Sequence, residues 1–286
     1  ALDAGGDGYN VALGYYSGLA MTTATQNVTI GYNAAYQLTT GTSNVVIGTN
    51  AMIAADGSEG KNIAIGAGTL AALDNDGDNY NIAIGHNAGN DITTGGYNTI
   101  IGGLAGDALT DGLSNTVVGY QALSAETGGD ENVAIGIQAL QVSDGGSNNT
   151  AVGRRAGVAV STGDNNTLIG HNAGDDVTSG TNNTLIGQGA GNVLTTGSNN
   201  VVVGRDTDLA ANSDNSSIII GEGLTGLGSN TTVIGNTATT KAHVHGLVKP
   251  TNATTSDVAV ALPNNIYVFS DDDGSTVTLP DSGAGA

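Results

Sequence analysis

The chain has 286 residues, with 47 glycines, one Phe, no Trp, no Cys and 38% hydrophobic residues. So few large side chains cannot fill an ordinary globular core, yet the apolar content is too high and too regular for a disordered chain. The formal charge of −20, from 26 acidic and 6 basic residues, argues against nucleic acid or an anionic membrane surface as the partner. No apolar run approaches the ~20 residues of a membrane span, so we expect no membrane insertion.

After a lead-in of residues 1–9, residues 10–240 repeat one motif, anchored on the glycine that ends a short apolar run. Fourteen copies follow one another at a spacing of 17 residues, except for single spacings of 18, 19 and 14. Such a period predicts a solenoid, in which each repeat buries its apolar face by stacking on its neighbours. The anchors are Gly14, Gly31, Gly48, Gly66, Gly85, Gly102, Gly119, Gly136, Gly153, Gly170, Gly187, Gly204, Gly221 and Gly235.

A typical copy reads as Asn, three residues of strand character, Gly, two variable residues, Ala and a polar turn. Runs of three β-branched or small residues between Asn and Gly are typical of very short strands, whereas Gly in every copy and Asn in all copies but those with Ser217 and Thr231 disfavour a helix. We therefore expect an all-β fold, a parallel β-solenoid of about fourteen 17-residue coils. The aligned Asn side chains should hydrogen-bond along the stack and satisfy backbone groups at the turn.

Both faces of the short strand are apolar. In the copy that ends at Gly170, for example, Ile169 lies on one face and Leu168 on the other. A thin coil has only one interior, so the second apolar face needs a partner, and we expect self-association. We place Ile169 in the buried row and Asp175 in a solvated turn, so Asp at position 169 should destabilise the assembly far more than Asn at position 175.

The turn DNDGDN carries Asp74, Asp76 and Asp78 around Gly77, as in the first half of a calcium-binding loop. The bidentate Glu expected at the twelfth position of an EF-hand is Gly85 here. These three aspartates are nevertheless candidate Ca²⁺ ligands. The alternative is that they are solvated turn acids, which keep a large assembly soluble.

No motif for catalysis stands out. GEGLTG at 221–226 matches a dinucleotide-binding pattern, but no helix pattern follows it and the expected acidic residue is missing. His86 and His171 occupy equivalent positions after an anchor glycine, where other copies carry Tyr, Gln, Ala or Arg, so they read as surface variation. We expect that the chain is not an enzyme.

The period stops after Ala238. Residues 241–256 read as a neck strand followed by a linker, and residues 257–286 as a small β-hairpin segment that turns on Asp273 and Gly274. The chain ends abruptly in GAGA, so we expect a fragment of a longer fibre.

The strings NIAIG, NVAIG, NTAVG and NTLIG, each followed two residues later by Ala, resemble the head repeats of trimeric autotransporter adhesins and related repeats in phage tail fibres. In that family the repeat is about 14 residues long and forms a left-handed parallel β-roll, with three chains packed around a common axis. The resemblance covers residues 10–240 and implies a homotrimer. Only the last spacing, from Gly221 to Gly235, has the family's length.

The leading hypothesis is a rigid, acidic, trimeric fibre or adhesin segment, located outside the cell on a virion or bacterial surface. Its partner would be a host or cell-surface receptor, a protein or a glycan. Phage tail fibre is favoured over bacterial adhesin or extracellular filament. Two alternatives are a polysaccharide-degrading tailspike and an ice-binding solenoid, the latter because Thr recurs eight residues after many anchors, as at Thr93 and Thr178.

The segment KAHVHG generates a testable prediction. In an extended strand His243 and His245 point to the same side, so three chains around one axis would bring six imidazoles together, an octahedral nitrogen site for Fe²⁺, Ni²⁺ or Zn²⁺. The pair also resembles the His-x-His metal sites of phage fibres and spikes. Elemental analysis of the purified assembly should find about one transition metal per three chains. The double variant His243→Ala, His245→Ala should lose the metal, and metal-free wild-type protein would refute the prediction.

Overall fold

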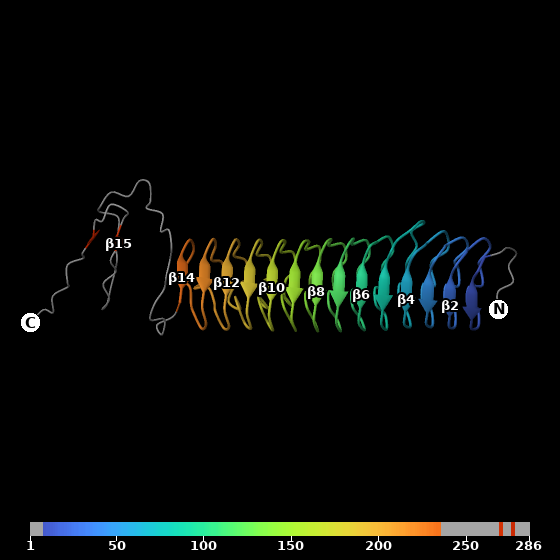
Figure 1. Ribbon diagram of the computed structural model, residues 1–286, viewed down its shortest axis with the longest axis horizontal. Helices are drawn as coiled ribbons and strands as arrows, with labels where there is room; N and C mark the ends of the chain where they lie inside the picture. The colour runs from blue at the N-terminus through green and yellow to red at the C-terminus, as the bar shows by residue number, and fades with distance from the viewer. Residues whose placement is uncertain (1–7, 236–268, 271–275, 278–286) are drawn as a thin grey trace, which may run out of the picture. The chain divides into compact units, whose positions relative to one another are not determined.

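The computed structural model describes residues 8–235 and two further short strands at 269–270 and 276–277. Fourteen strands of three residues form one parallel sheet, and their order in the sheet follows the sequence (Figure 1). The described residues contain no helix. These strands are β1 (Val11–Leu13), β2 (Val28–Ile30), β3 (Val45–Ile47), β4 (Ile63–Ile65), β5 (Ile82–Ile84), β6 (Thr99–Ile101), β7 (Thr116–Val118), β8 (Val133–Ile135), β9 (Thr150–Val152), β10 (Thr167–Ile169), β11 (Thr184–Ile186), β12 (Val201–Val203), β13 (Ile218–Ile220) and β14 (Thr232–Ile234).

The prediction of a parallel β-solenoid with a 17-residue repeat is confirmed, with about thirteen coils between the fourteen strands. Equivalent residues pair across each step, as Leu168 does with Leu185. The register is kept where the spacing is longer: Ile47 pairs with Ile65, and Ile65 with Ile84. The extra residues therefore lie in the turns, outside the sheet.

The anchor glycine is required because the chain turns sharply there while touching the next coil. Gly136 has φ +135, and a Cβ on it would lie 2.4 Å from the carbonyl oxygen of Gly153 in the next coil. Five residues before the anchor the backbone is again left-handed, as at Asn165 (φ 59) and Asn182 (φ 58). Asn tolerates this conformation better than most residues, which explains the Asn-Asn pairs of the repeat.

A ladder of buried asparagines joins the coils, as predicted. The backbone N–H of Asn183 donates to Oδ1 of Asn166 at 3.0 Å, and its Nδ2 donates to the carbonyl oxygen of Gly197 at 2.9 Å. Each coil thereby satisfies a turn amide and a turn carbonyl that would otherwise be buried without a partner. The buried members are Asn27, Asn44, Asn62, Asn81, Asn98, Asn115, Asn132, Asn149, Asn166, Asn183 and Asn200.

The core is one side chain deep. The middle residue of the strand points inward together with the Ala three residues after the anchor and, in most coils, an aliphatic residue seven after it. Large inward residues are accommodated by a glycine nearby. Leu168 and Leu185 fill the space beside Gly174, where a Cβ would lie only 2.8 Å from Leu185 Cδ1 and 3.0 Å from Leu168 Cδ2. In the coil of Ala134, where the strand residue is small, the position equivalent to Gly174 is filled by Leu140.

The placement of Ile169 in the buried row is wrong within a single chain. Leu168 is fully buried, whereas 38% of Ile169 is exposed. The inward row is formed by the middle residues of the strands, and it holds small residues such as Ala64 and Ala83 as well as large ones such as Leu185. The row that contains Ile169 faces outward.

The chain divides into two compact units, Ala1–Thr240 and Lys241–Ala286. In the second unit, β15 (Phe269–Ser270) pairs with β16 (Thr276–Val277) in antiparallel register, in the segment where the sequence predicts a hairpin.

Two adjacent glycines allow a matched test of why the anchor position, the corner of the coil, requires glycine. Gly102 has φ +143, and a Cβ there would lie 2.4 Å from the carbonyl oxygen of Gly119, whereas the nearest atom to a Cβ on Gly103 is 3.7 Å away in the Tyr120 ring. We predict that Gly102→Ala destabilises the solenoid by about 2 kcal/mol or more and that Gly103→Ala is close to neutral. Thermal denaturation and hydrogen exchange of the neighbouring coils measure the difference, and equal effects would contradict this account of the corner.

Candidate functional site

The outward face of the sheet is a continuous apolar strip. It consists of the first and third residues of β1 to β14, and all of these are Val, Ile, Leu or Thr. No charged side chain interrupts it, although the chain carries a formal charge of −20. Aliphatic side chains on the strip that are more than a third exposed lie at its two ends and on β6, β8 and β10, while its other residues are mostly half-buried: the exposed aliphatic ones are Val11, Leu13, Ile101, Ile135, Ile169, Ile218, Ile220 and Ile234.

Aromatic side chains flank the strip near its start. Tyr15 and Tyr32 stack with ring centroids 5.9 Å apart, and Tyr80 and Tyr97 with centroids 5.5 Å apart. All four are more than 40% exposed. They add apolar surface whose hydroxyl groups can accept and donate hydrogen bonds.

His86 and His171 are exposed, in agreement with their interpretation as surface variation. Nε2 of His171 lies 3.1 Å from Nη1 of Arg154 in the preceding coil. The candidate metal ligands His243 and His245 lie outside the described residues.

The recurring Thr eight residues after the anchor has a structural role. Oγ1 of Thr93 donates to the carbonyl oxygen of Thr110 at 3.2 Å, and Thr110 donates in turn to Thr127 at 2.9 Å. The hydroxyl groups thus join successive coils. In the column formed by these Thr residues, Asp56 and Asp74 take the place of two successive threonines.

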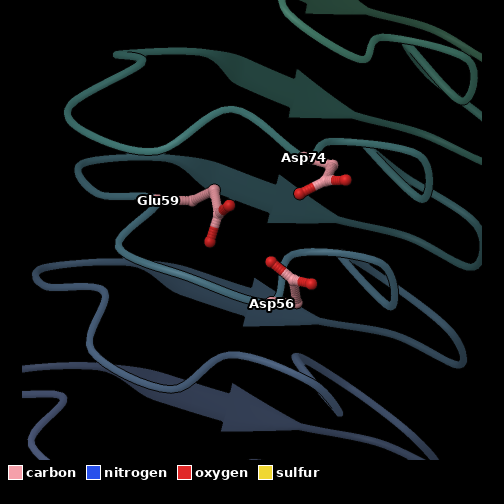
Figure 2. Close-up of side chains that lie close together, drawn as sticks. All are labelled: Asp56, Glu59 and Asp74. Carbon is pink, nitrogen blue, oxygen red and sulfur yellow. The ribbon is translucent and has the colours of Figure 1, made fainter.

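Asp56, Glu59 and Asp74 come together at this point, with their carboxylates directed toward one another (Figure 2). One carboxylate oxygen from each lies within 4.8 Å of the other two. Asp56 and Asp74 are exposed, but Glu59 is fully buried. Burial raises the pKa of Glu59, and the charges of Asp76 and Asp56 raise it further.

The structure brings only one of the three sequence-predicted calcium ligands, Asp74, into this cluster. Oδ1 of Asp76 accepts hydrogen bonds from the backbone N–H and the hydroxyl of Ser58, at 2.8 and 3.1 Å. Oδ2 of Asp78 lies 2.7 Å from Nζ of Lys61, and the hydrogen bonds that this lysine donates to Asp78 and Tyr80 raise its pKa.

Glu59 and Asp56 were missed by the sequence reasoning, which looked for alternating acids within one turn. The sequence did carry a signal for them, because both residues depart from the repeat. Asp56 stands in the Thr column, and Glu59 stands where other coils have Gly. Neither departure shows by itself which acids from different coils meet.

Comparison with protein-family models, with curated protein sequences and with solved structures finds no significant match for this chain. Among the residues that the structure describes, none belongs to a helix long and apolar enough to cross a membrane.

Three further acids lie partly buried in the turns. Burial raises the pKa of Asp107, Asp175 and Asp208, and a neighbouring acid raises each pKa further, for instance Asp176 beside Asp175. Such a carboxyl binds more protons in the folded chain than in the unfolded chain. The stability that it contributes is therefore present at low pH and is lost as the pH rises from the usual value of 3.8 through the raised pKa.

We predict that the chelator-treated protein melts at a higher temperature at about pH 4, near the lower end of this window, than at about pH 8. Asp175→Asn should reduce this difference and should not destabilise the protein at neutral pH, since it removes a carboxylate that burial disfavours. Circular dichroism melts across the pH range provide the measurement. A melting temperature that increases with pH would show that these carboxylates are stabilised as anions.

Proposed function

We propose that this chain is a rigid segment of a homotrimeric fibre or adhesin, in which three solenoids pack through their outward sheet faces and the turns present surfaces to a receptor. A phage tail fibre, exposed on the virion, is the favoured identity. A bacterial cell-surface adhesin or extracellular filament is the alternative.

The observation that carries this proposal is the uncharged strip on the outward face. Fourteen strands at about 4.8 Å give it a length of roughly 60 Å, and a three-residue strand gives it a width of roughly 10 Å. Its area, on the order of 600 Å², reaches the upper end of what monomeric proteins expose. A strip of this kind favours a protein partner that covers it along its whole length.

A second copy of the chain is the partner that fits best. The strip repeats at the spacing of the coils, and only a surface with the same spacing can contact it equally well at every coil. Another copy has that spacing by construction, and closed rings of identical chains leave no strip exposed. That the ring contains three chains rests on the resemblance to trimeric adhesin head repeats.

Stiffness and variable turns support the role in presentation. Each coil is joined to the next by the sheet, the Asn ladder and the Thr column, so the distance between the ends of the solenoid is fixed. The exposed tyrosine pairs and the turn acids differ from coil to coil, as expected of a surface that binds a receptor.

The ice-binding alternative loses its main support, because the Thr hydroxyl groups donate within the coil stack. A clear thermal hysteresis would nevertheless displace the fibre proposal. Within residues 8–235, no carboxylate pair stands out as suited to polysaccharide cleavage.

The mass of the native particle tests the proposal. We predict three times the 28.0 kDa mass of one chain, by light scattering after size exclusion. The double variant Ile135→Asp, Ile169→Asp should lower the mass, because each trimer would bury six unpaired charges.

The matched control is Leu19→Asp, Val142→Asp. These residues are 53% and 45% exposed, more than the 37% and 38% of Ile135 and Ile169, but they lie in the turns rather than on the strip. The control should remain trimeric. A wild-type monomer, or equal loss of mass in both double variants, would refute assembly through the strip.

A further inference from the structure

We propose that Asp56, Glu59 and Asp74 bind one Ca²⁺ ion, which links two successive coils of the solenoid (Figure 2). The three carboxylates come from two coils, and one oxygen of each lies within 4.8 Å of the others. Ca²⁺ prefers oxygen ligands and flexible geometry, and water can complete its coordination on the side where Asp56 and Asp74 are exposed.

The buried glutamate is the observation that points to a ligand. Glu59 is fully buried, and its Oε2 accepts a hydrogen bond from the backbone N–H of Gly57 at 3.0 Å. Its Oε1 is also buried and has no hydrogen-bond partner. A buried carboxylate oxygen without a partner is strongly unfavourable, and a bound cation would supply the missing interaction.

The fold makes room for Glu59 at the expense of the regular core. Its carbonyl oxygen accepts a hydrogen bond from Nδ2 of Asn44. In other coils the equivalent hydrogen bond runs from Asn27 to Gly41 and from Asn98 to Gly112, so Glu59 takes the place of a glycine. A Cβ on Gly41 would lie 2.5 Å from Leu38 Cδ1. In the coil of Glu59 the residue equivalent to Leu38 is Ala55, which leaves space for the longer side chain.

The two aspartates replace donors that normally join the coils. Thr39, Thr93 and Thr110 each donate a hydroxyl hydrogen bond to the next coil from this column. An ionised Asp has no proton to donate, so Asp56 and Asp74 remove two successive links and add two negative charges. A Ca²⁺ ion between them would restore the connection and neutralise the repulsion.

Calcium titration of the chelator-treated, full-length protein tests the proposal. Calorimetry with CaCl₂ should show one ion per chain, and Ca²⁺ should raise the melting temperature by several degrees, an effect that chelator reverses. Asp56→Asn and Glu59→Gln should each weaken binding by about tenfold or more.

Two controls separate this site from other acids. Asp144→Asn changes an aspartate of the same column in another coil, where Oδ1 accepts the Thr127 hydroxyl, and should leave binding unchanged. Asp76→Asn should also leave binding unchanged, whereas it would abolish binding if Asp74, Asp76 and Asp78 were the ligands.

Folding of the variants can be checked without the metal. In the presence of chelator, Glu59→Gln should melt no lower than the wild type, because it removes a buried charge. No binding at millimolar Ca²⁺, or binding that Asp56→Asn and Glu59→Gln leave intact, would overturn the proposal.

Discussion

The structure depends on one constraint: each coil must present the same backbone hydrogen-bonding groups, at the same positions, to the coil above and the coil below. With three-residue strands and a core one side chain deep, no coil can be stable alone. The Asn ladder and the Thr column extend the pairing beyond the strands, so that the turns are also held in register. The anchor glycines then follow from the close approach of successive corners.

This constraint explains which features could be predicted from the sequence. A 17-residue period with Asn and Gly at fixed positions leaves little freedom, so the strands, the Asn ladder and the location of the extra residues in the turns were predicted correctly. The two apolar faces of the strand could not be ranked by hydrophobicity. Nor could they be ranked by size, because Leu168, which is fully buried, and Ile169, which is 38% exposed, have side chains of equal size.

The candidate cation site was only partly predictable for a related reason. A turn such as DNDGDN is recognised by residues that are close in sequence, whereas a solenoid brings together residues that are one coil apart. Asp56 and Asp74 are neighbours through the stack, and Glu59 joins them in a coil where Ala55 replaces a larger aliphatic residue. In a repeat protein, departures from the repeat that fall in adjacent coils are thus a better guide to a site than a local motif.

The same stack gives the solenoid an outward strip that no other residue within 8–235 covers. Thin coils with two apolar faces bury one of them internally, and the other is available for a partner with the same repeat. A regular core and an outward apolar strip are thus two consequences of one repeated sequence, while the turns remain free to vary.

The most direct test of this account uses the absence of cysteine from the chain. Single Ile135→Cys and Val142→Cys variants differ in whether the thiol lies on the strip or in a turn of comparable exposure. In the native particle the thiol at position 135 should react with a small reagent at least about tenfold more slowly than the thiol at position 142, and equally fast after denaturation. Equal rates in the native particle would show that the strip is open to solvent and would contradict the account.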